Sequence, residues 1–229
     1  MGSSVPELLD SLHMAVNDEE RRVWASACAQ ALDLGGIAVS LGRELVWFSD
    51  TTSERLEDLQ FVLGQGPGLL LQDQDETGVR QVPDLERLLT EQWPQFAAEA
   101  QELGIAALFV WPVHVGAVRI GTMTGYRRTT GPLAPLQSAQ GWLVADALAE
   151  HVLNHWLVPN GYGAGPGHAG AVDLHRAEVH QATGVLSERL GVPLTEALDR
   201  LRAQAYTSGM SLADTAHAII HRELPDDSR

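Results

Sequence analysis

The sequence has no lysine, because all 15 of its basic residues are arginine. This absence excludes chemistry that depends on a lysine amine, such as Schiff-base catalysis and phosphate binding by a P-loop. Positive charge is scarce as well, since 30 acidic residues give a formal net charge of −15. A basic footprint over the whole molecule, of the kind that binds nucleic acid or an anionic membrane, is therefore excluded.

Cysteine is almost as rare, with Cys28 as the single example. One cysteine cannot form an intramolecular disulfide, and this usage is typical of a reducing, cytoplasmic compartment. Cys28 lies in the apolar helical run WASACAQAL, where we expect a buried structural thiol, with a nucleophile as the alternative. No hydrophobic run approaches the length needed to cross a bilayer, so we expect no membrane partner.

Motifs for catalysis and metal binding are weak. The glycine-rich residues 64–68 lack the order of a P-loop, so we expect a tight turn there, with phosphate binding as the alternative. Two histidine pairs, His151/His155 and His217/His221, have the spacing of one helix face; surface or interface positions are expected, with metal binding as the alternative. No Ser-His-Asp order or GxSxG motif is present. The sequence thus predicts no enzyme, no metal and no cofactor.

Residues 1–158 alternate between helical and extended patterns. Two hairpins stand out, at residues 36–49 and at residues 106–126, with Gly116 as the turn of the second. The segments around the first hairpin are expected as a helix over 5–34 with a break near Asn17-Asp18, a helix or loop over 53–60 and a strand that could begin over 59–63. Further along, we expect an extended piece over 79–84, a helix over 84–103 that is locally disturbed at Pro94, and a helix over 133–157. This order predicts an α+β fold in which helices pack against an antiparallel sheet.

The same region resembles a GAF domain, the small-molecule sensor fold. The resemblance depends on a series of short phrases in the right order: Leu63-Gly64-Gln65-Gly66-Pro67-Gly68, Pro83-Asp84-Leu85, Trp93-Pro94-Gln95-Phe96, Gly104-Ile105, Trp111-Pro112-Val113 and Ile120-Gly121. It implies a cavity that takes an unknown small-molecule ligand. The candidate lining residues, for each of which core packing is the alternative, are Trp47, Phe61, Trp111, Met123 and Tyr126.

Residues 159–170, PNGYGAGPGHAG, are rich in glycine and proline and are expected to form a flexible linker. Residues 171–229 then contain three helical patterns. The first runs from about Val172 and ends at Gly191, the second opens at Pro193 and ends at Ser208-Gly209, and Ser211 caps the third. The predicted domains are therefore residues 1–158 and 171–229, the second all-helical.

The C-terminal helices resemble the ANTAR domain, the three-helix RNA-binding module of bacterial transcription antiterminators. The matching residues are Arg176, Gln181-Ala182, Gly184-Val185-Leu186, Arg189, Ala197, Leu201-Arg202, Ala205, Leu212, Ala216 and Ile219. Thr183 departs from the family, which usually has lysine there. The resemblance implies that RNA stem-loops are bound by residues of the first two helices, namely Arg176, Gln181, Thr183, Arg189 and Arg202.

Six arginines and nine acidic residues lie in this C-terminal segment, so its own charge is −3. RNA binding therefore requires the guanidinium groups to cluster on one face. We expect a cytoplasmic, homodimeric antitermination regulator that responds to a ligand or partner. The alternative is an adaptor whose ANTAR-like helices bind only protein, and the local arrangement of the arginines distinguishes the two.

Overall fold

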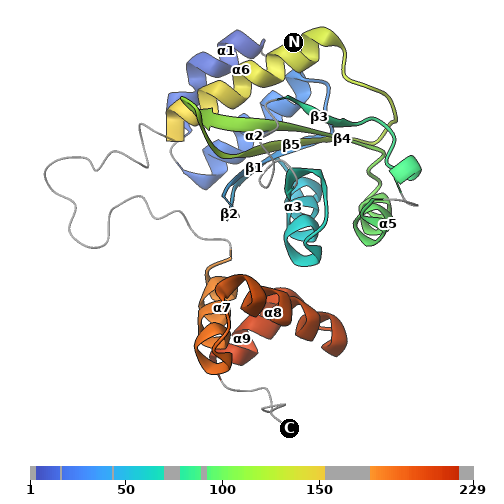
Figure 1. Ribbon diagram of the computed structural model, residues 1–229. Helices are drawn as coiled ribbons and strands as arrows, with labels where there is room; N and C mark the ends of the chain where they lie inside the picture. Colours follow the sequence, from blue (N-terminus) through green and yellow to red (C-terminus); the bar gives the residue numbers. More distant parts are fainter. Residues whose placement is uncertain are drawn as a thin grey trace, which may run out of the picture. The chain divides into compact units, whose positions relative to one another are not determined.

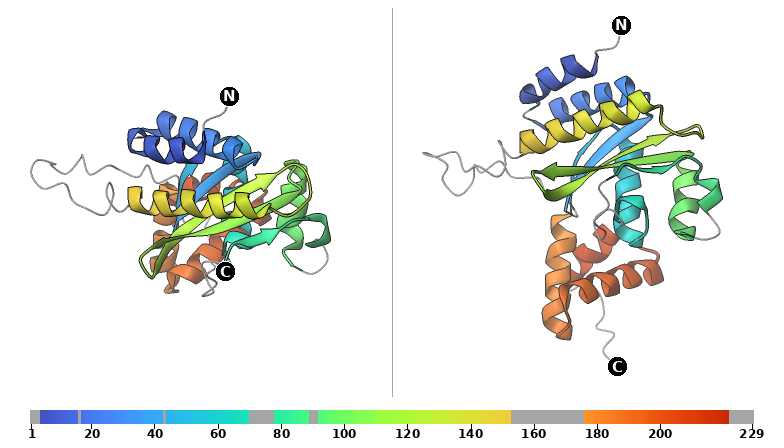
Figure 2. Two further views of the ribbon diagram at one scale, coloured as in Figure 1. Left: turned by 90° about the horizontal axis from the view of Figure 1, so that it is seen from above. Right: turned by 45° about the horizontal axis from the view of Figure 1, so that its top comes forward.

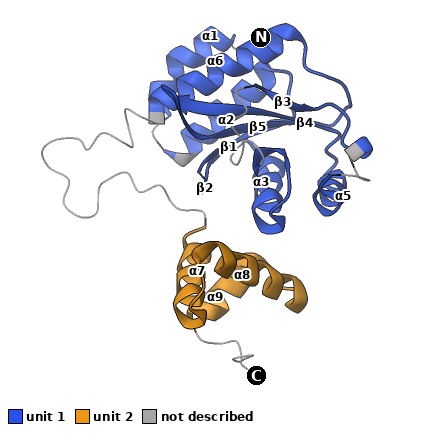
Figure 3. Ribbon diagram, in the orientation of Figure 1, with its two compact units in different colours: residues 1–172 blue, residues 173–229 orange. Residues whose placement is uncertain are grey.

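The computed structural model describes residues 4–15, 17–42, 44–69, 78–88, 92–152 and 176–221. The chain divides into two compact units, residues 1–172 and residues 173–229 (Figure 3). The predicted linker at residues 159–170 lies outside the described residues. No helix among those ranges is both long and apolar enough to span a membrane.

A five-stranded antiparallel sheet forms the centre of the N-terminal unit. Its strand order is β2-β1-β5-β4-β3, and every neighbouring pair is antiparallel. Both predicted hairpins are present, as the β1–β2 and β4–β5 pairs. The sheet confirms the expected α+β class. The strands are β1 (Gly36–Leu41), β2 (Glu44–Phe48), β3 (Arg80–Val82), β4 (Ala107–Val115) and β5 (Val118–Arg127).

Helices cover both faces of this sheet (Figures 1 and 2). One face packs against α2 (Asp18–Ala31) and α6 (Pro135–Val152), and α1 (Val5–Ser11) and η1 (Leu12–Met14) pack against these helices. The other face packs against α3 (Thr51–Leu63) and, beside it, α5 (Pro94–Glu102), with η2 (Glu86–Leu88) nearby. Two apolar clusters follow from this arrangement, one on each face. Successive side chains along a strand point to opposite faces of the sheet, so neighbouring residues of one strand join different clusters.

Local capping explains where the helices begin and end, and it corrects two sequence-based expectations. Asn17 caps α2, which confirms the break that was expected there. The strand expected over residues 59–63 is wrong, because Asp50 caps α3 and the helix continues to Gly64, whose φ is 62°. The single helix expected over residues 84–103, with only a local disturbance at Pro94, is also wrong, because η2 and α5 are separate elements there. Trp93 has φ 55°, which is incompatible with a helix, and α5 begins only at Pro94.

The helix α6 is fixed to the sheet at Gly141. A Cβ atom on Gly141 would overlap the Trp111 ring of β4, so only glycine allows this approach. The Trp111 indole Nε1 also donates a hydrogen bond to the Ser138 carbonyl of α6, at 3.2 Å. On the same side of the sheet, Cys28 is fully buried, and burial raises the pKa of its thiol to about 12.

The C-terminal unit is a three-helix arrangement of α7 (Ala177–Leu190), α8 (Leu194–Ser208) and α9 (Leu212–Ile220). Three predicted boundaries are confirmed: Gly191 and Gly209 adopt positive φ after α7 and α8, and the Ser211 side chain accepts a hydrogen bond from the Asp214 amide. The first helix was expected from about Val172, but α7 begins at Ala177, and residues 172–175 lie outside the described residues. The buried hydrophobic residues of this unit are all aliphatic, namely Val179, Ala182, Ala197, Leu198, Leu201, Ala205, Leu212, Ala216, Ala218 and Ile219.

Candidate functional site

The RNA-contact residues predicted on α7 divide into buried and exposed positions. Arg176 is only 5% exposed, and Thr183 is also buried, with its hydroxyl donating to the Val179 carbonyl at 2.7 Å. Gln181 and Arg189 are exposed. Arg176 and Thr183 therefore contribute to the fold of the helix in this structure, whereas Gln181 and Arg189 are available to a partner.

The arginines of α8 are paired with carboxylates of the same helix. Arg202 Nη1 lies 2.8 Å from Asp199 Oδ1, and Arg200 Nη2 lies 2.6 Å from Glu196 Oε1. The Arg202 side chain is only 14% exposed. These pairs neutralise the positive charges of Arg200 and Arg202, although partly exposed ion pairs of this kind add little stability.

Arg189 differs from the α8 arginines, because no carboxylate lies within 4.0 Å of it among the described residues. Arg176 is buried and Arg202 is paired with Asp199, so the three predicted arginines differ in exposure and in pairing. Sequence spacing alone did not indicate this, because pairing within α8 depends on which rotamers its side chains adopt.

Histidines also contact each other in the C-terminal unit. The His217 and His221 rings of α9 are 4.3 Å apart, and His217 Nδ1 lies 3.4 Å from Glu178 Oε1 of α7. Within the described ranges, no group of three His, Cys, Asp or Glu residues has the geometry of a metal site. In the N-terminal unit, His151 is buried against the Trp47 ring at 5.3 Å, so it is a core residue rather than a surface one; His155 lies outside the described residues.

The five predicted pocket residues of the N-terminal unit do not lie together. Trp47, Trp111 and Met123 belong to the cluster beneath α2 and α6. Tyr126 belongs to the opposite cluster, and Phe61 is buried on α3, which covers that opposite face. Met123 and Tyr126 are both on β5 but differ in parity, so they point to opposite faces. One pocket lined by all five side chains is thus excluded by the sheet itself.

A buried polar layer, which was not predicted from the sequence, lies between α3 and the sheet. Ser40 Oγ and Gln60 Nε2 each donate to the Glu57 carboxylate at 2.7 Å, and Gln60 Oε1 accepts from the Gly68 amide at 2.8 Å. Glu57 is 6% exposed. A buried carboxylate needs such hydrogen bonds, because removing it from water is costly. The available signal was Ser40 within an otherwise apolar strand.

Two threonines of β5 extend this layer. Thr122 is opposite Ser40 in the β1–β5 ladder and Thr124 is opposite Ala38, so both share the α3 face with Ser40. Each is 1% exposed, and neither hydroxyl has a hydrogen-bond partner among the described residues. An unpaired buried hydroxyl costs roughly 1–3 kcal/mol. The alternating Thr-x-Thr-x-Tyr pattern of residues 122–126 was the sequence signal that could have indicated this polar layer.

Tyr126 completes the same face at the end of β5. Its hydroxyl donates to Asp50 Oδ1 at 3.2 Å, and Asp50 also caps α3. Burial, followed by the charge of Asp50, raises the pKa of Tyr126. The α3 face of the sheet therefore carries a row of hydroxyl and carboxylate groups in place of a purely apolar core.

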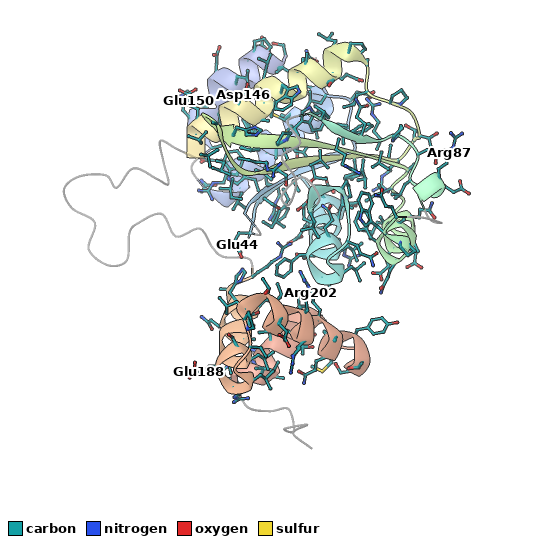
Figure 4. All side chains as sticks on the ribbon, in the orientation of Figure 1. Glu44, Arg87, Asp146, Glu150, Glu188 and Arg202 are labelled. Carbon is teal, nitrogen blue, oxygen red and sulfur yellow. The ribbon has the colours of Figure 1, made fainter. Side chains whose placement is uncertain are left out.

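Two surface hollows lie elsewhere in the N-terminal unit. A groove of about 590 Å³ runs between α1 and α2, and its lining includes Leu8, Met14, Val23, Trp24 and Ala27. A smaller hollow of about 340 Å³ lies between the β4–β5 turn and α6, where Asp146 and Glu150 project (Figure 4). Neither hollow contains any of the five predicted pocket residues.

Comparisons with known proteins found one family match and a set of similar solved structures. Residues 173–220 match the family model of the ANTAR domain. No curated protein matches the chain. The solved structures that are similar include the GAF domain of an Acinetobacter phosphoenolpyruvate-protein phosphotransferase, with 10% identity, coverage of 69% of this chain and 95% of that one, and a TM-score of 0.49.

A second similar structure is a domain from Sinorhizobium meliloti 1021 that is described as part of a two-component sensor histidine kinase protein; it has 18% identity, covers 59% of this chain and 90% of that one, and has a TM-score of 0.46. A third is the phycoerythrobilin-bound GAF domain of a cyanobacterial phytochrome, with 8% identity, coverage of 66% and 95%, and a TM-score of 0.42. The family match and the three helices coincide at the C-terminal end, where the chain carries an ANTAR domain at residues 173–220.

Proposed function

We propose that this protein is a transcription antitermination regulator that binds RNA stem-loops through its C-terminal unit. The observation that carries the proposal is the ANTAR match over residues 173–220, which coincides with α7, α8 and α9 packed as one compact unit. A regulator of this kind acts in the cytoplasm by holding RNA in a form that excludes a terminator. No catalytic step is required of it.

The exposed residues of α7 are the proposed RNA contacts. Arg189 offers a guanidinium without a carboxylate partner, and Gln181 offers amide groups that read base edges or phosphates. Arg176, Thr183 and Arg202 are proposed to act indirectly, because their side chains are largely buried. Arg202 becomes a direct contact only if RNA displaces Asp199.

For the N-terminal unit we propose a sensor role, with the ligand held on the α3 face of the sheet. The support is the buried polar layer, in which Thr122 and Thr124 have hydroxyls that a polar ligand would satisfy. Glu57 would accept a hydrogen bond from the same ligand. This site replaces the mixed pocket expected from the sequence.

Dimerisation is proposed to link the sensor to RNA binding. Leu136 and Leu143 of α6 are 68% and 51% exposed, and their seven-residue spacing puts them on one side of the helix. Paired α6 helices would bring two RNA-binding units to one transcript. A charged variant, L143E, is expected to convert dimers to monomers in sedimentation velocity. V118E, which changes an exposed apolar residue of the β4–β5 hairpin, is expected to leave the dimer intact.

A protein-binding adaptor is the second candidate function. The observation in its favour is the ion pairing on α8, where Glu196 and Asp199 neutralise two of the arginines that RNA would need. Such an adaptor would dimerise through the same surfaces and bind no RNA at any salt concentration.

A gel-shift experiment decides between these functions. The full-length protein is mixed with a pool of RNAs that each carry two tandem stem-loops with randomised loops, over a range of salt concentrations. We expect a shift that weakens with salt, and a salt slope that falls by about one in magnitude for R189A. The matched control is R87A, which removes an exposed arginine from η2 of the other unit (Figure 4). The absence of any shift at low salt would reject the RNA-binding function and support the adaptor.

A further inference from the structure

The C-terminal unit has a single aromatic side chain, and it is not in the core. Residues 173–229 contain no phenylalanine, no tryptophan and one tyrosine, Tyr206. Tyr206 lies in the last turn of α8 and is 76% exposed, the highest value among the large hydrophobic side chains of the described residues. Its side chain makes no hydrogen bond or ring contact within those residues. The fold therefore gains almost nothing from this ring.

The backbone beneath Tyr206 is held firmly although the ring is free. The helix ends at Gly209 in a left-handed conformation, with φ 67°. The Gly209 amide donates to the Tyr206 carbonyl at 3.3 Å, and the Met210 amide donates to the Ala205 carbonyl at 3.1 Å. These bonds fix the end of α8 before α9 begins. Tyr206 thus presents a rigid aromatic face, with few rotatable bonds to order on binding.

The chain segment around Tyr206 is uncharged, unlike the rest of the C-terminal unit. Residues 203–213 contain no charged side chain, although the unit as a whole is acidic. Met210, four residues further along the chain, is 37% exposed and is also uncharged. The next carboxylate along the chain, that of Asp214, is held by Ser211 Oγ at 2.7 Å at the start of α9. A polyanion can therefore approach this turn with less repulsion than it meets elsewhere on α8.

We propose that Tyr206 is a stacking platform for an unpaired RNA base. This inference rests on the proposed RNA binding and names the part of the RNA that α8 recognises, namely a base turned out of a loop. Proteins that bind unpaired nucleotides place aromatic rings where bases can stack, and each stacked base contributes substantially to affinity. Stacking matters more here than in a basic protein, because Arg200 and Arg202 are paired with carboxylates.

Substitutions at Tyr206 distinguish stacking on the aromatic ring from simple apolar contact. With a stem-loop RNA that the unmodified protein shifts in the gel experiment, Y206A is expected to weaken binding roughly ten- to a hundredfold, in line with the loss of one stacked base. Y206L keeps apolar bulk without a π-face and is expected to weaken binding to the same extent. Y206F and Y206W keep the face and are expected to bind within about threefold of the unmodified protein. The matched control is L194A, which shortens an exposed side chain at the other end of α8.

A spectroscopic measurement reports stacking directly. 2-Aminopurine is placed at each loop position of the RNA in turn, since its fluorescence is quenched when it stacks on an aromatic ring. We expect quenching at one position with the full-length protein and with Y206F, and its loss with Y206L. Thermal melts by circular dichroism should be unchanged for all variants, because the ring is exposed.

The outcomes are distinguishable. If the unmodified protein binds the RNA and Y206A binds equally well, the stacking inference is overturned while the RNA-binding function stands. If no RNA is bound by the unmodified protein, the function fails and the inference fails with it. If Y206A loses RNA binding only because it no longer dimerises in sedimentation velocity, the ring acts between copies of the chain, which also overturns the inference.

Discussion

Aromatic residues occupy opposite places in the two units. In the N-terminal unit, Trp24, Trp47, Phe96, Phe109 and Trp111 are all buried and build the two faces of the sheet. In the C-terminal unit the buried hydrophobic residues are aliphatic and the one aromatic ring is exposed. Residue type alone therefore does not indicate function. In the first unit the informative side chains are buried hydroxyls, and in the second the informative side chain is an exposed ring.

The largest expected effect is the protection of the Cys28 thiol from chemical labelling. Cys28 lies in the N-terminal unit, so its labelling rate reports on the unfolding of that unit. The thiol is fully buried and its pKa is raised from 9.0 to about 12, so it reacts only after unfolding. At pH 8 we expect its reaction with a disulfide reagent to be at least about a thousandfold slower than in urea. The raised pKa favours folding below pH 9, and this contribution declines as pH rises from 9 towards 12. Fast labelling of the native protein would contradict the buried position.

Removing one large side chain from each core tests whether the units unfold independently. W111A is expected to destabilise the N-terminal unit by about 3–5 kcal/mol, because a fully buried tryptophan is lost. L201A is its counterpart in the C-terminal unit, at about 2–5 kcal/mol. Cys28 labelling should accelerate with W111A only, while circular dichroism registers both. Equal acceleration by L201A would mean that the two units unfold as one.

The capping residue of α9 is the next test. S211A removes the side chain that accepts a hydrogen bond from the Asp214 amide, and it should destabilise the C-terminal unit by about 1 kcal/mol. Urea unfolding followed by circular dichroism measures the change. S211G should cost only a few tenths of a kcal/mol, because glycine is tolerated at the N-cap.

The smallest expected effect is an increase in the free energy of unfolding, whereas the substitutions above decrease it. T124V replaces a buried hydroxyl without a partner by a methyl group of the same shape, so it should stabilise the ligand-free N-terminal unit by up to about 1 kcal/mol. S40A, on the neighbouring strand and the same face, should destabilise it because it removes a hydrogen bond to the buried Glu57. Urea unfolding midpoints compare the two. Destabilisation by T124V would show that its hydroxyl is satisfied in the native protein.

The sequence predicted the elements better than the sites. The hairpins, the break before α2 and the three C-terminal helices followed from local signals such as Asn17, Gly191 and Ser211. The extent of α3 and the late start of α5 did not, because Asp50 capping and the positive φ of Trp93 compete with the hydrophobic pattern.

The sites depended on information that a single strand or helix does not contain. Whether Met123 and Tyr126 share a pocket depends on which face of the sheet each side chain meets, and they meet opposite ones. Whether Arg202 faces a partner depends on Asp199, three residues earlier, which pairs with it. The predicted domain limits at residues 158 and 171 fall outside the described residues and stay predictions.

The close approach at Gly141 has a mechanical consequence for α6. The Trp111 ring fills the notch that glycine leaves, and its indole nitrogen is tied to Ser138 one turn earlier. A slide of α6 along its own axis would bring Val144, one turn further along the helix, towards the ring. We therefore expect α6 to move relative to the sheet by tilting about Gly141 rather than by sliding along its axis.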